Sequence, residues 1–305
     1  MYWPPLTHAL ENVKKVYFAP DGIFHLINPN TLLDGVSQKY VLDEVAIRTV
    51  PTIAEIHREQ PVSIATATVL GNPVYGEGQT RPQGDTLRTS REFFSRQPIS
   101  ALPGTKTEVE TISKLLTQHR AKATLLTGTR ASKQSLFENN RADVMHIATH
   151  GFWIDKPASP SGYYNLFETM SSSGLVLAGA QKKLGDGSFS LATQGILTSA
   201  EIQDMNLFGT RLVVLSACET GLGEVVPGEG LFGLKRALQK SGVRSLITSL
   251  WKVDDEATMQ FMTLFYNQLL ETQSLSGSFD SAMRTLKEKF PDPYYWGAFV
   301  LTNNR

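Results

Sequence analysis

The sequence predicts an α/β fold in which a mostly parallel sheet carries helices on both faces. Strand-like and helix-like segments alternate along most of the 305 residues, which is the pattern of such sheets. The clearest strand, at residues 211–217, has an unbroken apolar run, as expected for a parallel strand that is buried on both faces. We expect a small β extension at residues 1–66 and the main sheet with its helices at residues 67–305.

The N-terminal extension has the pattern of paired strands. Residues 16–19 and 23–27 are strand-like, and the turn-forming run PDG separates them. Residues 40–50 alternate weakly between apolar and polar side chains, so a further strand is expected there.

Helical and strand-like segments then alternate to the end of the chain. Helices are expected at residues 105–116, 200–206, 230–241, 254–270 and 279–290, and further strands at residues 243–250 and 294–301. The segments 75–104 and 152–190 are rich in glycine, serine and other loop-forming residues, so we expect long surface loops.

Charge and composition exclude several classes of protein. The chain has 29 basic and 29 acidic residues, so it lacks the positive charge that draws a protein to nucleic acid or to an anionic membrane. Its apolar runs are far shorter than the roughly 20 residues of a membrane span, and its start has no signal-peptide pattern. A single cysteine excludes an internal disulfide. We therefore expect a cytoplasmic protein that contacts neither nucleic acid nor a membrane.

A histidine and the single cysteine each follow a buried strand pattern. His150 ends the run VMHIATH, and Cys218 ends the run LVVLSAC. The carboxyl ends of parallel strands meet at one edge of a sheet, where ligands bind in folds of this class. If the two strands are neighbours, about 5 Å apart, the two side chains face each other across a substrate.

These two residue types suit nucleophilic catalysis. A thiolate is the nucleophile, and an imidazole takes its proton and later protonates the leaving amine. Gly151 leaves a backbone N–H open beside His150, where a tetrahedral oxyanion could sit. His146, on the strand itself, is expected to pack in the core. A lone cysteine without partners predicts no zinc site.

The segments HIATHG and LSACETG resemble the two signature segments of the CHAT domain, a caspase-like family related to separase. Further similar segments follow the family's order: PDGIFH resembles its opening hairpin, GLF at residues 230–232 the start of its helix after the cysteine, SLWKVDDEAT its next strand end and YYWGAFVL its closing strand. Together they span about residues 15–302.

The resemblance implies a caspase-like topology, with residues 67–305 as the peptidase core. It makes Cys218 the nucleophile and His150 the general base of a cysteine endopeptidase that acts on protein substrates. This chemistry needs neither a metal nor an organic cofactor. The family usually carries tetratricopeptide repeats and is known for regulated proteolysis, which implies a regulatory repeat region or an activating protein outside this chain.

The resemblance also points to a pocket for the residue before the cut. The run from Leu250 to Asp255 is similar to a separase segment whose aspartate holds a substrate arginine, and the match places Asp255 at that position. Asp254 and Asp255 also stand where a helix N-cap is expected, so capping is the alternative. Trp251 belongs to the same segment, and Ser216 stands where some other caspase relatives have an aspartate that binds basic side chains.

Two other functions stay open. The first is a catalytically silent CHAT domain that serves as a scaffold or protein-binding module. The second is a nucleotide-binding α/β protein, because residues 228–233 spell GEGLFG, the spacing of a dinucleotide-binding loop. In such sites the glycines follow a strand directly, whereas here Gly228 comes ten positions after Cys218.

Overall fold

The fold is described from a computed structural model of the whole chain. The structure describes residues 12–35, 37–56, 59–76, 98–153, 170–183, 189–217, 224–226 and 230–303. Cys218 and most of the two predicted loop segments, 75–104 and 152–190, lie outside these residues.

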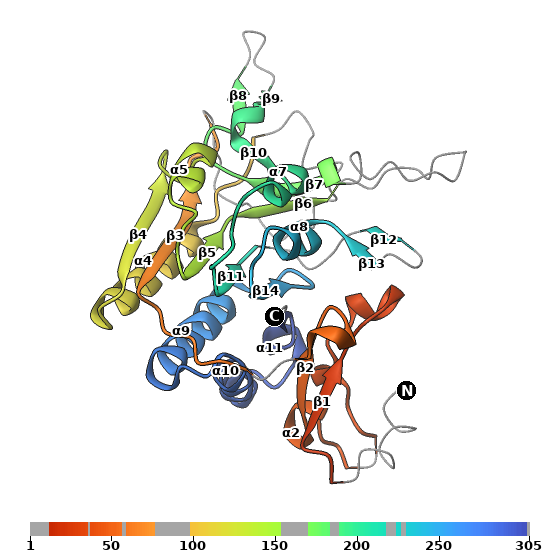
Figure 1. Cartoon of the computed structure of the whole chain (residues 1–305). Helices are drawn as coiled ribbons and strands as arrows, with labels where there is room; N and C mark the ends of the chain where they lie inside the picture. Colours follow the sequence, from red (N-terminus) through yellow and green to blue (C-terminus); the bar gives the residue numbers. More distant parts are fainter. Residues whose placement is uncertain are drawn as a thin grey trace, which may run out of the picture.

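An eight-stranded sheet forms the centre of the molecule, in the order β1-β2-β15-β14-β11-β5-β3-β4. Its strands are β1 (Lys15–Phe18), β2 (Ala46–Thr49), β3 (Thr66–Pro73), β4 (Lys122–Gly128), β5 (Val144–Ala148), β11 (Leu212–Leu215), β14 (Ser245–Ser249) and β15 (Phe299–Asn303). Each neighbouring pair is parallel except β14 with β15. The mostly parallel sheet predicted from the sequence is therefore confirmed, with β1 and β2 at one end and β4 at the other (Figure 1).

Helices cover both faces of this sheet. One face packs against α4 (Pro103–Gln118), α9 (Asp255–Thr272) and α10 (Leu275–Lys289), and the other against α5 (Lys133–Glu138), α7 (Ser199–Gln203) and α8 (Leu234–Lys240). Strand residues alternate between the two cores: Val214 belongs to the first, and its neighbours Val213 and Leu215 to the second. None of the described helices combines the length and apolar character that a bilayer crossing requires.

Smaller elements complete the fold. An antiparallel sheet joins β6 (His150–Trp153), β7 (Ser173–Val176) and β10 (Ile196–Thr198), and two hairpins pair β8 (Gln181–Lys183) with β9 (Phe189–Leu191) and β12 (Glu224–Val226) with β13 (Gly230–Phe232). The remaining short helices are α2 (Val41–Glu44), α11 (Pro293–Trp296) and the 3-10 turns η2 (Gly22–Leu26), η3 (Pro29–Thr31), η4 (Ile53–Glu55) and η5 (Thr193–Gly195).

The prediction of an opening hairpin was wrong. Gly22 has a φ of 55°, and the Asp21 carboxylate accepts a hydrogen bond from its N–H, so residues 22–26 turn into η2 rather than a second strand. Strand β1 pairs instead with β2, in parallel. Residues 41–44, expected in a strand, form α2 before β2 begins.

Three other boundaries differ from the sequence prediction. Pro293 at the first helical position and the Asp292 cap, which accepts from Tyr294 N–H, favour α11, so the closing strand begins only at Phe299. Helix α7 is capped by Thr198 and ends at Gln203. Residues 230–232 form β13, and α8 begins only at Leu234. This run is thus part of a hairpin and not the strand-to-helix turn of a dinucleotide site.

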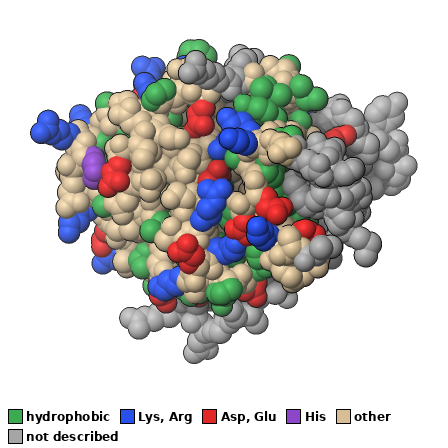
Figure 2. All heavy atoms as spheres, turned by 90° about the horizontal axis from the view of Figure 1, so that it is seen from below, with side chains coloured by type: hydrophobic (Ala, Val, Ile, Leu, Met, Phe, Trp, Pro, Cys, Tyr) green, Lys and Arg blue, Asp and Glu red, His purple; other side chains and the backbone are tan. Residues whose placement is uncertain are grey.

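The surface reflects the balanced charge of the sequence. On the face shown in Figure 2, acidic and basic side chains of the described residues lie interspersed rather than grouped by sign. Ion pairs such as Lys287 with Asp43, at 2.5 Å, join α2 to α10. Arg48 on β2 likewise contacts Asp280 on α10 at 2.9 Å, with both side chains largely buried.

Candidate active site

Strands β5 and β11, the two that lead to His150 and Cys218, are neighbours in the sheet. They pair in parallel, with Leu212 opposite Val144, and Ser216 N–H donates to the Ile147 carbonyl at 2.9 Å. The condition stated for the two side chains, that their strands are neighbours, is therefore met. Ala217, the residue before Cys218, is described, but the separation of Cys218 from His150 stays a prediction.

His150 is the first residue of β6 and is held by a backbone carbonyl. Its Nε2 lies 2.9 Å from the carbonyl oxygen of Ser100. A carbonyl only accepts hydrogen bonds, so Nε2 carries the proton and donates it. In the neutral ring the lone pair that a base needs is then on Nδ1.

Tyr75 orients the same imidazole from another direction. The two ring centroids are 5.4 Å apart with the planes tilted by 39°. The Thr149 hydroxyl donates to the Val176 carbonyl, so the Tyr75 hydroxyl donates to Thr149 Oγ1, at 3.1 Å. Because Tyr75 is itself 1% exposed, the ring beside His150 has little freedom to move.

The Ser100 carbonyl is positioned by its own neighbours. Ile99 N–H donates to Gln181 Oε1 at 2.8 Å, and Gln181 N–H donates to the Tyr75 carbonyl at 2.8 Å. Ile99 and Tyr75 also share a small buried cluster with Phe152. No sequence motif marks Tyr75, Ser100 and Gln181, so these supports of His150 are seen only in the structure.

The surroundings of His150 favour its neutral form. The pKa of His150 is lowered from 6.5 to about 4, mainly by burial; the hydrogen bond to the Ser100 carbonyl raises it, and the positive charge of Lys252 adds to the lowering. At neutral pH the imidazole is therefore neutral, with one nitrogen free of a proton, as a general base must be.

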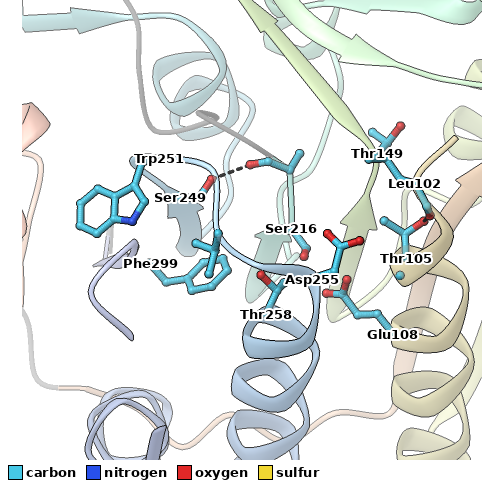
Figure 3. A pocket seen from close by; sticks show the side chains of 13 residues that line it. Leu102, Thr105, Glu108, Thr149, Ser216, Ser249, Trp251, Asp255, Thr258 and Phe299 are labelled. Carbon is cyan, nitrogen blue, oxygen red and sulfur yellow. Dashed lines mark hydrogen bonds between the residues drawn. The ribbon is translucent and has the colours of Figure 1, made fainter. Parts of the chain in front are cut away.

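A cavity opens beside this strand edge, between the starts of α4 and α9 (Figure 3). Ser216, Trp251 and Asp255, three of the residues predicted to bind substrate, line it together. Ala217 and Thr149, which directly precede Cys218 and His150, line it as well. The sequence-predicted pocket residues are thus brought to one place, next to the two strand ends.

The two neighbouring aspartates have different environments. Asp254 caps α9, and its Oδ1 accepts from the N–H groups of Glu256 and Ala257 at 3.0 and 3.1 Å. Asp255 lines the cavity instead. Its carboxylate packs against Gly104, where an added Cβ would lie 2.8 Å from Asp255 Oδ2, so only glycine leaves room for it.

Two hydrogen bonds shape the cavity wall on the β14 side. The Ser249 hydroxyl donates to the Ala217 carbonyl, which ties the end of β14 to the residue before Cys218 (Figure 3). Trp251 Nε1–H donates to the Tyr294 carbonyl at 3.0 Å, which anchors the indole to α11. Gly151, the candidate oxyanion residue, lies in β6 opposite Leu175 and is half-buried.

Glu108 of α4 also lines the cavity, although the sequence analysis did not select it. Its side chain is buried, and Oε1 lies 3.1 Å from His146 Nε2. His146 is fully buried in the core, as expected. The described residues include no group of three histidine, cysteine or acidic side chains placed to hold a metal ion.

The family model of the CHAT domain matches residues 1–304. The chain belongs to the CHAT domain family. Mouse tetratricopeptide repeat protein 28 is 25% identical to it over 307 aligned residues, which cover 94% of this chain and 12% of the relative. The human protein of the same name is also 25% identical, over 92% of this chain and 12% of its own length. The CHAT domain described here thus spans about an eighth of these relatives.

Solved structures of cysteine proteinases share this fold. The Arg-specific cysteine proteinase gingipain R superposes with a TM-score of 0.58 at 12% identity, covering 99% of this chain and 66% of the proteinase. A complex of the pro- and mature domains of Porphyromonas gingivalis RgpB gives 0.54, with the same identity and coverage. The caspase-like α/β fold expected from the sequence is confirmed.

Proposed function

We propose that this CHAT domain is a cysteine endopeptidase in which Cys218 is the nucleophile and His150 the general base. The observation that carries the proposal is the pairing of β5 with β11, which brings the segments before His150 and Cys218 together. The Nε2–H bond to Ser100 supports it, because it leaves the lone pair of His150 on Nδ1.

The proposed reaction has two steps. The Cys218 sulfur, having passed its proton to His150, attacks the scissile carbonyl carbon and forms a C–S bond. The carbonyl oxygen becomes an oxyanion, for which Gly151 N–H is the candidate donor. As the carbonyl re-forms, the C–N bond breaks and His150 protonates the leaving amine. Water, deprotonated by His150, then attacks the thioester and releases the new carboxyl end and the free thiol.

The cavity between α4 and α9 is proposed as the pocket for the residue before the cut. Asp255 would pair with an arginine or lysine side chain, with Trp251 and Ser216 forming neighbouring walls. A carboxylate facing a cation in a closed pocket makes a charge-assisted hydrogen bond, which is stronger than a neutral one.

We also propose that a region or protein outside this CHAT domain regulates the activity, in the cytoplasm. The curated relatives are tetratricopeptide repeat proteins that are much longer than this domain. Such a repeat region, or a separate activating protein, is the proposed regulator.

Cleavage of a peptide library by the whole chain tests the proposed function. We expect Cys218→Ala to abolish cleavage and His150→Ala to reduce the rate at least about a hundredfold, the range of a lost general base. His119→Ala is the matched control, because His119 is an exposed histidine at the end of α4. A protein that cleaves no peptide but folds normally would instead be a catalytically silent scaffold.

A further inference from the structure

We infer that Glu108 is a second specificity-determining residue of the pocket, placing another carboxylate beside Asp255 so that the pocket takes an arginine side chain. The inference rests on the proposed function of this cavity as the pocket for the residue before the cut. Both residues line the same cavity, from α4 and from the start of α9. Figure 3 shows their carboxylates close together in the space between the two helices.

Glu108 is unusual because it is an acidic side chain inside the protein. It is 3% exposed, and only one of its oxygens, Oε1, is hydrogen-bonded, to His146 Nε2 at 3.1 Å. The other oxygen, Oε2, has no hydrogen bond to any described residue. Because Glu108 lines the cavity, a cationic ligand there could supply a donor to this oxygen.

A buried chain of hydrogen bonds holds Glu108 in place. The Tyr266 hydroxyl lies 3.3 Å from His146 Nδ1, and both Tyr266 and His146 are fully buried. Burial, together with the charge of Glu108, raises the pKa of Tyr266 well above its usual value, so this hydroxyl keeps its proton. This hydroxyl shares a hydrogen bond with Nδ1, and His146 donates from Nε2 to the Glu108 carboxylate, which only accepts. His146 thus fixes the position of the Glu108 carboxylate at the cavity wall.

Arginine matches two neighbouring carboxylates better than any other side chain does. Its planar guanidinium carries five N–H donors directed along several edges, so one edge can serve Asp255 and another Glu108. A side chain without a positive charge could not form charge-assisted hydrogen bonds with the two carboxylates. The pocket should therefore discriminate against a neutral side chain of the same shape.

Citrulline provides that comparison, since it replaces the guanidinium by a neutral urea of nearly the same shape. The experiment measures the affinity of two acetylated tetrapeptides, ending in argininamide or citrullinamide, for the Cys218→Ala protein by calorimetry. Binding does not require cleavage, so failure of the proposed chemistry and failure of this inference are distinguishable. The variants are Glu108→Gln, Asp255→Asn and, as the matched control, Glu110→Gln, whose exposed carboxylate lies on the same helix.

We expect Glu108→Gln to weaken binding of the arginine peptide at least about tenfold and to leave the affinity for the citrulline peptide nearly unchanged. The glutamine still accepts the hydrogen bond from His146, so the fold should survive. The Asp255→Asn protein tests the inference without altering Glu108: it should still prefer arginine to citrulline by about tenfold. Equal affinity of the two peptides for the parent protein, loss of the preference in Asp255→Asn, or a Glu108→Gln protein that behaves like Glu110→Gln overturns the inference.

Discussion

The buried chain from Tyr266 through His146 to Glu108 makes a strong prediction about stability. In His146→Leu, the Glu108 carboxylate and the Tyr266 hydroxyl both lose the only partner that the described residues give them. Leaving a buried charged group without its partner costs about 3–5 kcal/mol, and an unsatisfied buried hydroxyl costs about 1–3 kcal/mol. Because the two costs overlap, we expect the free energy of unfolding to fall by about 3–5 kcal/mol.

Urea unfolding followed by far-ultraviolet circular dichroism measures this loss. The matched control is Glu110→Gln, which breaks the exposed pair of Lys106 with Glu110, 4.0 Å apart on the same helix, and should cost less than about 0.5 kcal/mol. The double variant His146→Leu/Glu108→Leu removes the stranded charge and should recover at least about 2 kcal/mol. A single variant that loses under about 1 kcal/mol, or a double variant no more stable than the single one, would refute the reasoning.

Three further predictions concern the site itself. The pKa of His150 is lowered from 6.5 to about 4, mainly by burial, so the free energy of unfolding should keep its full value above pH 6.5 and decline as the pH falls toward 4. Urea titrations should show a smaller decline in His150→Gln. A pH profile of His150→Gln that matches the parent protein would contradict this prediction. Asp254→Ala should lower the free energy of unfolding by about 1 kcal/mol and leave peptide selectivity intact. Asp255→Asn should change peptide selectivity without that loss of stability. The reverse result would exchange the roles of the two aspartates. Gln181→Leu removes the acceptor for Ile99 N–H that positions Ser100, so we expect the cleavage rate to fall about tenfold at unchanged affinity for the arginine peptide. A cleavage rate equal to that of the parent protein would show that this support is dispensable.

The parallel sheet and the strands before His150 and Cys218 could be predicted from the sequence because they depend on local pattern, whereas the adjacency of these two strands is seen only in the structure. The apolar run of β11 and the alternation of strands with helices require a parallel sheet buried on both faces. The family-like segments then placed His150 and Cys218 at its carboxyl edge. The same local logic failed at residues 22–26, because a turn signal before an apolar run fits a hairpin and a 3-10 turn equally well.

The supports of the site could not be predicted, because they come from contacts distant in sequence. Ser100 and His150 are 50 residues apart, and Gln181 lies 82 residues after Ile99. Glu108 has the sequence context of an ordinary amphipathic helix, and only the packing of α4 against α9 shows that it faces His146 and the cavity. Asp254 and Asp255 are equally good N-cap residues by type, so their separate roles emerge only from the start of α9.

The central claim is that His150 activates Cys218, and covalent labelling tests it most directly. A peptide ending in a thiol-reactive group is added to the folded whole chain, and the labelling rate and labelled residue are determined by mass spectrometry. We predict a single adduct at Cys218, formed at least about tenfold more slowly in His150→Ala and at the parent rate in His119→Ala. Labelling at the same rate in His150→Ala as in the parent protein, or no adduct in any of them, would contradict the account.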